Sequence, residues 1–191
     1  MSKVDFKPGN MLYPLPVIMA TVQGNDGKPN IITLAWAGTV NSDPPMISIS
    51  VRKERFSYHM LMENPEFCVN LTTKDLAFAT DLCGVKSGKN VDKWKLAGLT
   101  PEPCSVIKPP MIKECPVNIE CKVEKYEELG THTCFFGRVV AVHVDDSYMD
   151  EKGTFHFNDT NPIAYSHGKY FTLGEQVGKF GYSVQKKDSK K

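Results

Sequence analysis

Apolar and polar residues alternate over several stretches of the chain, which predicts a protein built mainly from β-strands. These stretches are rich in β-branched residues and end at turns that contain Pro, Gly or Asn. Strands are expected over residues 17–22, 31–40, 46–52, 66–71, 115–129 and 131–144. The stretch 31–40 is apolar on both faces, so it is expected as one interior strand of a barrel or sandwich.

The last two stretches flank a glycine turn at Gly130 and predict a long hairpin. Alternate side chains in its first strand form an apolar face and a polar face. The expected inward face holds Val117, Ile119, Cys121 and Val123. The expected outward face holds Asn118, Glu120 and Lys122.

Short helices interrupt the strand pattern. One is expected over residues 57–64, with Ser57 as its N-cap and Pro65 preventing its continuation. Others are expected over 73–84 and 93–96. Residues 155–175 are expected to form an aromatic segment rich in loops. Residues 186–191 are expected to form a frayed, solvated tail. The sum is one antiparallel, mainly-β domain over residues 1–191, with a core of about 12–175 and a few peripheral helices.

The strand at 46–52 has two contrasting faces. Ile47, Ile49 and Val51 form an apolar face that is expected to pack on the core. The opposite face is small, polar and finally cationic, which favours a polar ligand, and it holds Met46, Ser48, Ser50 and Arg52.

The composition is that of an ordinary globular protein. Of 191 residues, 41% are apolar and 24% charged, and the net charge is +1. A nucleic-acid binder is disfavoured because no global positive field exists, so an anion site must be local. No run of 18 apolar residues predicts a membrane span, and the first residues lack the apolar core of a signal peptide. A cytoplasmic protein without a membrane partner is expected.

The cysteines and histidines form no metal motif. The six cysteines include no C-x-x-C pair, and His59, His143, His156 and His167 are scattered. In a reducing cytoplasm the cysteines are interpreted as small buried apolar residues, with a redox thiol or a disulfide partner as the alternative. No metal site and no acid–base dyad are expected.

A cluster of positive charge follows the strand at 46–52. Arg52, Lys53 and Arg55 precede Ser57, where a helix begins, and helix N-termini attract anions. The cluster therefore suits a phosphate group. The alternative is a solvated basic turn with Glu54 as its local partner.

Several motifs in order resemble the flavin reductase-like, FMN-binding split-barrel family, which includes the flavoredoxins. They are Asn30, residues 35–38, Pro44–Pro45, the basic turn, residues 67–70, "SGKNVDKW", "GTHTCFFGRV" and "NPIAYSHGKYFTLG". The resemblance covers about residues 14–174. It implies a split β-barrel homodimer with FMN bound near the subunit interface.

The resemblance also implies a set of cofactor-binding residues, to which Asn30 belongs. Arg52, Lys53, Arg55 and Ser57 are candidates for the FMN phosphate. Backbone groups of Thr39, Val40, Asn41 and Ser42 would line the flavin ring, and Ser50 would face it. Ser87, Gly88 and Lys89 would approach the flavin or the partner subunit.

Three aromatic candidates have competing interpretations. His132 would contact the flavin or a nicotinamide, and is the one possible catalytic residue, or it is bonded to backbone at a hairpin end. Trp36 is either a flavin contact or a core residue. Tyr170, like Tyr165, would shield the ring or only cover the barrel mouth.

The implied function is a redox flavoprotein that passes electrons through a bound FMN, because flavin itself carries the redox chemistry. The electrons would come from NAD(P)H or from a redox protein partner, although no G-x-G-x-x-G motif supports nicotinamide use. One alternative is an NAD(P)H:flavin oxidoreductase that releases flavin as a substrate. Another is a flavin-binding module without redox activity.

Overall fold

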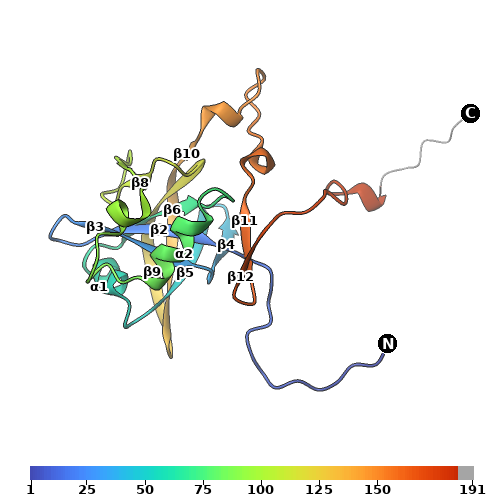
Figure 1. Cartoon of the computed structure of the whole chain (residues 1–191), viewed down its shortest axis with the longest axis horizontal. Coiled ribbons are helices and arrows are strands. Elements are labelled where there is room, and N and C mark those ends of the chain that lie inside the picture. The colour runs from blue at the N-terminus through green and yellow to red at the C-terminus, as the bar shows by residue number, and fades with distance from the viewer. Residues whose placement is uncertain (185–191) are drawn as a thin grey trace, which may run out of the picture.

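A seven-stranded antiparallel sheet dominates the computed structural model, which describes residues 1–184 (Figure 1). The strand order is β3-β2-β6-β9-β10-β5-β4. The strands are β2 (Ile18–Gln23), β3 (Pro29–Leu34), β4 (Ala37–Ser42), β5 (Pro45–Arg52), β6 (Glu66–Leu71), β9 (Val117–Leu129) and β10 (His132–Val144).

Helices and short strands lie around this sheet. The helices are α1 (Phe56–Glu63), α2 (Ala77–Val85) and α3 (Lys93–Ala97). The short strands are β1 (Leu15–Pro16), β7 (Pro101–Glu102), β8 (Met111–Ile112), β11 (Ile163–Ser166) and β12 (Lys169–Thr172). Single 3₁₀ turns are η1 (Asp146–Tyr148), η2 (Phe157–Thr160) and η3 (Tyr182–Val184).

The sheet curls until its two edges approach each other. Its edge strands β3 and β4 are consecutive in the chain, and β3 also contacts β5. The backbone N–H of Ser50 donates to the carbonyl of Trp36, between β3 and β4, at 2.8 Å. The predicted mainly-β split barrel with a few peripheral helices is therefore confirmed, and solved relatives described below share it.

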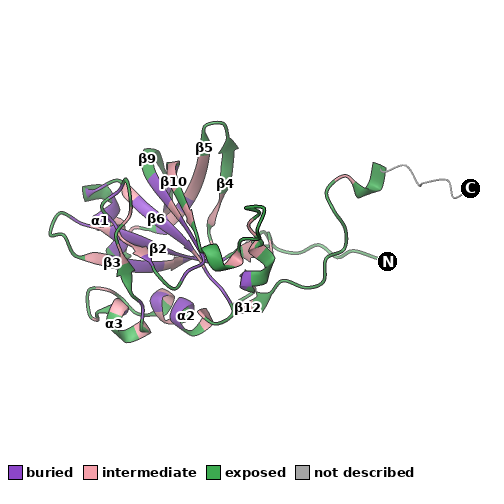
Figure 2. Ribbon diagram, turned by 90° about the horizontal axis from the view of Figure 1, so that it is seen from above, coloured by how far each residue is buried: buried purple, intermediate pink, exposed green. Residues whose placement is uncertain are grey.

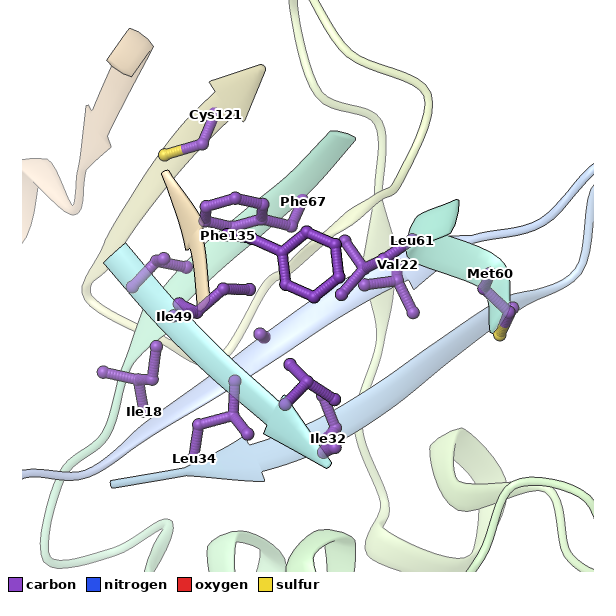
Figure 3. Packing of buried hydrophobic residues seen from close by; sticks show 13 residues of the cluster. Ile18, Val22, Ile32, Leu34, Ile49, Met60, Leu61, Phe67, Cys121 and Phe135 are labelled. Atoms are coloured by element: carbon purple, nitrogen blue, oxygen red, sulfur yellow. The ribbon is translucent and has the colours of Figure 1, made fainter. Parts of the chain in front are cut away.

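The core fills the inside of this curved sheet. Phe67 of β6 and Phe135 of β10 are completely or almost completely buried at its centre, between the side chains of β2 and β5 (Figure 3). A second cluster lies on the other face of β2 and β3, where Met19 and Ile31 pack against α2 and the segment after α3. Figure 2 shows buried residues both in β2 and in α2. Both faces of β2 and β3 are apolar because each covers a different core.

The stretch 31–40 is not the single interior strand that its apolar pattern predicted. It divides into β3 and β4, which are the two edges of the sheet. The chain bends at Ala35 and Trp36 because it must cross from one edge to the other there. A single straight strand would leave the barrel open.

The hairpin is confirmed, but its expected polar face is wrong in part. Strands β9 and β10 pair from Val117↔Val144 to Leu129↔His132. Asn118 and Glu120 are buried, whereas Lys122 is exposed. The segment between β7 and β8 covers this end of β9, so both of its faces lie under protein.

Helix α1 begins one residue earlier than expected. Arg55 occupies the N-cap with an extended backbone, and no side chain caps the helix. Ser57 is the second helical residue and is buried, so its prediction as the N-cap is wrong. Its hydroxyl is consequently available to other groups.

The C-terminal part contains more regular structure than expected. Residues 163–172 form the hairpin of β11 and β12, which pairs with β1. His167 and Gly168 have positive φ angles of 46° and 77° in its turn. The predicted tail at 186–191 lies outside the described residues. Among residues 1–184, no helix has the length and apolarity needed to cross a membrane.

Candidate functional site

A basic cavity of about 230 Å³ lies between the start of α1 and the loop that follows α2. Three cationic residues line it, and Glu54 is its one acidic lining residue within the described chain. We call it the basic cavity. Its lining comprises Asn30, Ile32, Glu54, Arg55, Phe56, Ser57, Cys83, Gly84, Lys86, Ser87, Gly88 and Lys93.

The wall of the cavity is fixed by a buried hydrogen bond. Asn30 Nδ2 donates to Ser57 Oγ at 2.8 Å, which joins β3 to α1. Gly88 packs directly on this pair, since a Cβ on Gly88 would lie 2.1 Å from Asn30 Oδ1. Only glycine allows the loop backbone to approach so closely. Three predicted ligands are therefore parts of one tightly packed wall.

Two cations converge on the C-terminal end of α2. Lys93 is 4% exposed, and its Nζ donates to the carbonyls of Ile31 at 2.6 Å and Cys83 at 2.7 Å. Arg55 Nη1 donates to the carbonyl of Gly84 at 3.5 Å. The last carbonyls of a helix lack partners within the helix, and these carbonyls and the helix dipole both favour cations at a helix C-terminus. The positive charge of the cavity is thus positioned by backbone groups.

Burial changes the acidity of this cluster. Desolvation lowers the pKa of Lys93 to about 8; nearby Cys83 opposes this shift and nearby Arg55 adds to it. Burial raises the pKa of Cys83 to about 11. An ammonium with a pKa near neutrality gains charge when an anion approaches, because the anion stabilises the protonated form. A bound anion should therefore raise the pKa of Lys93 and hold this residue in its charged form.

A second hollow, of about 360 Å³, adjoins the basic cavity and shares Ile32 and Arg55 with it. We call it the aromatic hollow. The rings of Trp36 and His132 lie 6.3 Å apart between centroids and only 11° from parallel. Other lining residues are Asn10, Thr33, Leu34, Ser50 and Arg52. The arrangement offers two nearly parallel aromatic faces beside a cation.

His132 has a lowered pKa, mainly because of its burial and also because Arg52 lies nearby, while Glu54 has the opposite effect. The shift favours the neutral imidazole. Its Nδ1 lies 2.9 Å from the hydroxyl of Thr131, so this nitrogen already has a partner. The partner of Nδ1 is thus a side-chain hydroxyl and not a backbone group, as the alternative interpretation of His132 had expected.

Several predicted residues lie together and others do not. Asn30, Arg55, Ser57, Ser87 and Gly88 line the basic cavity, and Trp36, Ser50, Arg52 and His132 line the aromatic hollow. Lys89 lines a neighbouring hollow with Gly88. Thr39, Val40, Asn41 and Ser42 occupy the exposed edge strand β4 and line neither space.

Three further candidates have partners of their own. Lys53 Nζ forms an ion pair of 2.5 Å with Glu128, outside both spaces. Arg52 pairs with Glu54 at 2.7 Å, so its charge is partly neutralised. Tyr170 donates to Asp81 at 3.0 Å, and burial together with this bond raises its pKa to about 12.

Sequence reasoning missed Lys86 and Lys93 as components of the cavity. Lys86 lies in a polar stretch that resembles a solvated loop, and Lys93 begins the short helix that was predicted over 93–96. Lysines at both kinds of position are ordinarily exposed, so no local signal marks either residue.

Comparisons with known proteins agree with this geometry. The family model for the flavin reductase like domain matches residues 10–174. The flavoredoxin of Desulfovibrio vulgaris (Miyazaki F) superposes with a TM-score of 0.89 at 30% identity, covering 96% of this chain and all of that chain. The flavoredoxin of Methanosarcina acetivorans superposes with a TM-score of 0.86 at 30% identity, covering 97% and 100%.

A similar sequence also occurs in Archaeoglobus fulgidus. This uncharacterised protein is 32% identical over 161 residues, which are 84% of this chain and 89% of the relative. The family model alone covers well over half of the chain. The chain belongs to the family of proteins with a flavin reductase like domain, and its function is a flavin-related redox function.

Proposed function

We propose that the protein is an FMN-binding redox protein that passes electrons through a bound FMN. In this proposal the phosphate occupies the basic cavity and the flavin ring lies in the aromatic hollow. The observation that carries the proposal is the direct connection of a cation-lined cavity to a hollow with two nearly parallel aromatic rings.

The residues present fit the group. A phosphate dianion needs cations and hydrogen-bond donors, and Arg55, Lys86 and Lys93 supply the former. Lys93 uses two of its three N–H donors on carbonyls, so one remains for an anion. The Gly88 backbone lies so close to Asn30 that any larger side chain would displace the Asn30 amide from the wall of the cavity.

FMN supplies hydride and electron transfer when it is bound, and the protein supplies binding and orientation. Trp36 and His132 would orient a planar ring by stacking, and Ser50 would offer a hydroxyl to its edge. Arg52 lies at the same hollow and would favour negative charge on a reduced ring. The remaining predicted contacts to the flavin ring stay predictions; they are Thr39, Val40, Asn41, Ser42 and Tyr170.

Tight retention of FMN distinguishes the proposed function from that of an enzyme that releases flavin. The buried Lys93 and the Asn30–Ser57 bond form a site that is rigid before any ligand arrives, and preorganisation favours affinity. The two solved structures compared above are both flavoredoxins. This similarity favours electron transfer with a redox protein or NAD(P)H as partner.

We further propose that the protein acts as a homodimer. The chain ends form two arms that leave the body on the same side in both views (Figures 1 and 2). Phe6, Val177 and Phe180 are largely or fully exposed on these arms. Because monomers rarely expose so much apolar surface, a second copy is the expected cover. Sedimentation equilibrium would show a single species of twice the chain mass.

Removal of one cation tests the phosphate site. Arg55→Ala should weaken FMN binding about 10- to 100-fold, since a charge-assisted hydrogen bond contributes about 1.5 to 3 kcal/mol. Riboflavin has no phosphate, so its binding should not change. Lys53→Ala is the matched control, because this lysine belongs to the same turn but pairs with Glu128. Equal FMN affinities for all three proteins would refute the phosphate assignment.

A visible spectrum separates the possible roles. A purified yellow protein that only dithionite or a reduced redox protein bleaches would support a carrier. Bleaching by NADH or NADPH under anaerobic conditions would support a reductase with bound FMN. A colourless protein that also fails to bind added FMN would refute the proposed function.

A further inference from the structure

Two of the six cysteines interact through their side chains, and neither of them lines the basic cavity. Among the free cysteines, Cys104 is only partly buried, whereas Cys68 is completely buried. Cys68 belongs to β6, and Cys104 lies in the segment between β7 and β8. We call them the thiol pair. The proposed function uses neither of them.

The carboxylate of Glu120 brings the pair together. In the antiparallel pairing of β6 with β9, Cys68 lies opposite Glu120, so both side chains point to the same face. Glu120 accepts a hydrogen bond of 2.6 Å from the backbone N–H of Ser105. This bond holds the residue next to Cys104 at the carboxylate that lies opposite Cys68. The contact with Cys104, followed by burial, is the leading cause of a raised pKa at Cys68.

Strand alternation excludes the nearest competitor. Cys121 follows Glu120 in β9 and lies opposite Phe67, with its side chain in the barrel core. It therefore faces away from Cys68 across the sheet. Three buried thiols remain. Cys83 and Cys115 pack in the second cluster with α2, and Cys134 lies opposite Ser50 where β10 pairs with β5. Cys104 is consequently the natural partner of Cys68.

We propose that Cys68 and Cys104 form a reversible disulfide when the protein meets hydrogen peroxide. The Cys104 sulfur attacks the peroxide oxygen, which gives a sulfenic acid and releases water. The Cys68 sulfur then displaces the hydroxyl from that sulfenic acid, which forms the S–S bond and releases a second water. Two electrons pass from the two sulfurs to hydrogen peroxide, and both thiol protons end in water.

The order of these steps follows from exposure. Solvent reaches Cys104 but not Cys68, so the oxidant reacts with Cys104 first. The second step requires a Cys68 thiolate, and its raised pKa makes this step faster at higher pH. Cys83 and Cys115 pack in the second cluster and Cys121 in the barrel core, so none of these three is placed to attack an oxidised Cys104.

The disulfide would constrain the segment that supplies half of the basic cavity. Residues 69–103 lie between the two cysteines and include Ser87, Gly88 and Lys93. Closing a covalent loop around this segment restricts the unfolded chain. The oxidised protein should therefore melt on the order of 10 °C higher than the reduced protein.

Thiol counting with peptide mapping tests the proposal. The protein is reduced, desalted, treated with excess hydrogen peroxide and denatured before titration with Ellman's reagent. The six thiols of the wild type should fall to four, with a Cys68–Cys104 peptide in the non-reducing map, and dithiothreitol should restore six. Cys104→Ala should form no disulfide.

Cys115→Ala is the matched control, because it removes a buried thiol from the second cluster and leaves the pair intact. Its thiol count should fall by two, as in the wild type. Retention of all six wild-type thiols, a disulfide between other cysteines, or a loss that dithiothreitol does not reverse would each overturn the proposal. The result does not depend on FMN, so it cannot be confused with a failure of the proposed function.

Discussion

The buried carboxylate of Glu120 allows a sharp test of how the segment between β7 and β8 is held. Glu120 is 0% exposed. Its Oε1 accepts from Ser105 N at 2.6 Å and lies 2.6 Å from His143 Nε2. Its Oε2 accepts from Val106 N at 2.8 Å and from Ile107 N at 3.0 Å. All acceptor positions of the carboxylate are thus used.

The substitution Glu120→Gln preserves the shape but removes one acceptor oxygen. Wherever the amide NH₂ is placed, it faces at least one backbone N–H that then has no acceptor. The loss of charge-assisted bonds at a buried position should cost about 3 to 5 kcal/mol. For a chain of 191 residues, this corresponds to a fall in Tm of about 10 °C or more.

Thermal unfolding followed by circular dichroism, in reducing buffer, measures the effect. Glu114→Gln is the control, because its exposed carboxylate also accepts a backbone hydrogen bond, from Thr100 N at 3.0 Å. That change should lower Tm by no more than about 2 °C. If Glu120→Gln also stays within about 2 °C of the wild type, the carboxylate does not anchor the segment.

The pH dependence gives an independent check. Burial alone would raise the pKa of Glu120, but hydrogen bonds from His143 and three backbone N–H groups outweigh it and lower the pKa. A carboxylate with a lowered pKa stabilises the fold above its unfolded pKa, and this contribution disappears as the pH falls through the folded value. The Tm difference between wild type and Glu120→Gln should therefore shrink below about pH 4.

Three further predictions concern single side chains. Because Lys93 has a pKa of about 8, FMN affinity should fall by up to tenfold per pH unit above that value. Fluorescence titration at several pH values measures this dependence, and Lys93→Met should make FMN affinity independent of pH in that range. Gly88→Ala should weaken FMN binding at least about tenfold by the same titration, because its Cβ would displace the Asn30 amide from the wall of the basic cavity. Gly38→Ala should leave FMN binding unchanged, because a Cβ there meets nothing within 4 Å in the described part of the chain. Thr133→Val should raise stability in urea by about 1 kcal/mol, since the buried Thr133 hydroxyl has no hydrogen-bond partner among residues 1–184. Thr21→Val should lower stability, because the Thr21 hydroxyl donates to a backbone carbonyl.

The strands could be predicted from the sequence because their signal is local. Ile47, Ile49 and Val51 alternate with small polar residues, and the structure buries the two sets differently. The crossing between β3 and β4 could not be predicted in this way. Neither Ala35 nor Trp36 is a turn residue, and the bend arises only because the two sheet edges must be joined.

The residues of the candidate site likewise fall into those that local sequence predicts and those that it does not. Arg55 and Ser57 were predicted from a cluster within a few residues, and the structure places both at the basic cavity. Lys93 and Glu120 were missed because a lone charged residue in a polar pattern predicts exposure. Their burial depends on β3, α2 and the segment before β8, which are distant in the sequence.

Lys93 and Glu120 have the same structural role, because each attaches an irregular segment of the chain to the barrel. The chain between β6 and β9 has few strand partners, so its irregular segments need other anchors to the barrel. Lys93 bonds only to carbonyls, whereas Glu120 is bonded by three backbone N–H groups and His143. A buried charge satisfied by backbone tolerates little displacement, because any shift leaves it unpaired in a medium of low polarity. The cation fixes the loop that completes the basic cavity, and the anion fixes the loop that carries Cys104. The proposed ligand site and the proposed thiol pair therefore each involve a loop that one buried charged side chain holds against the barrel.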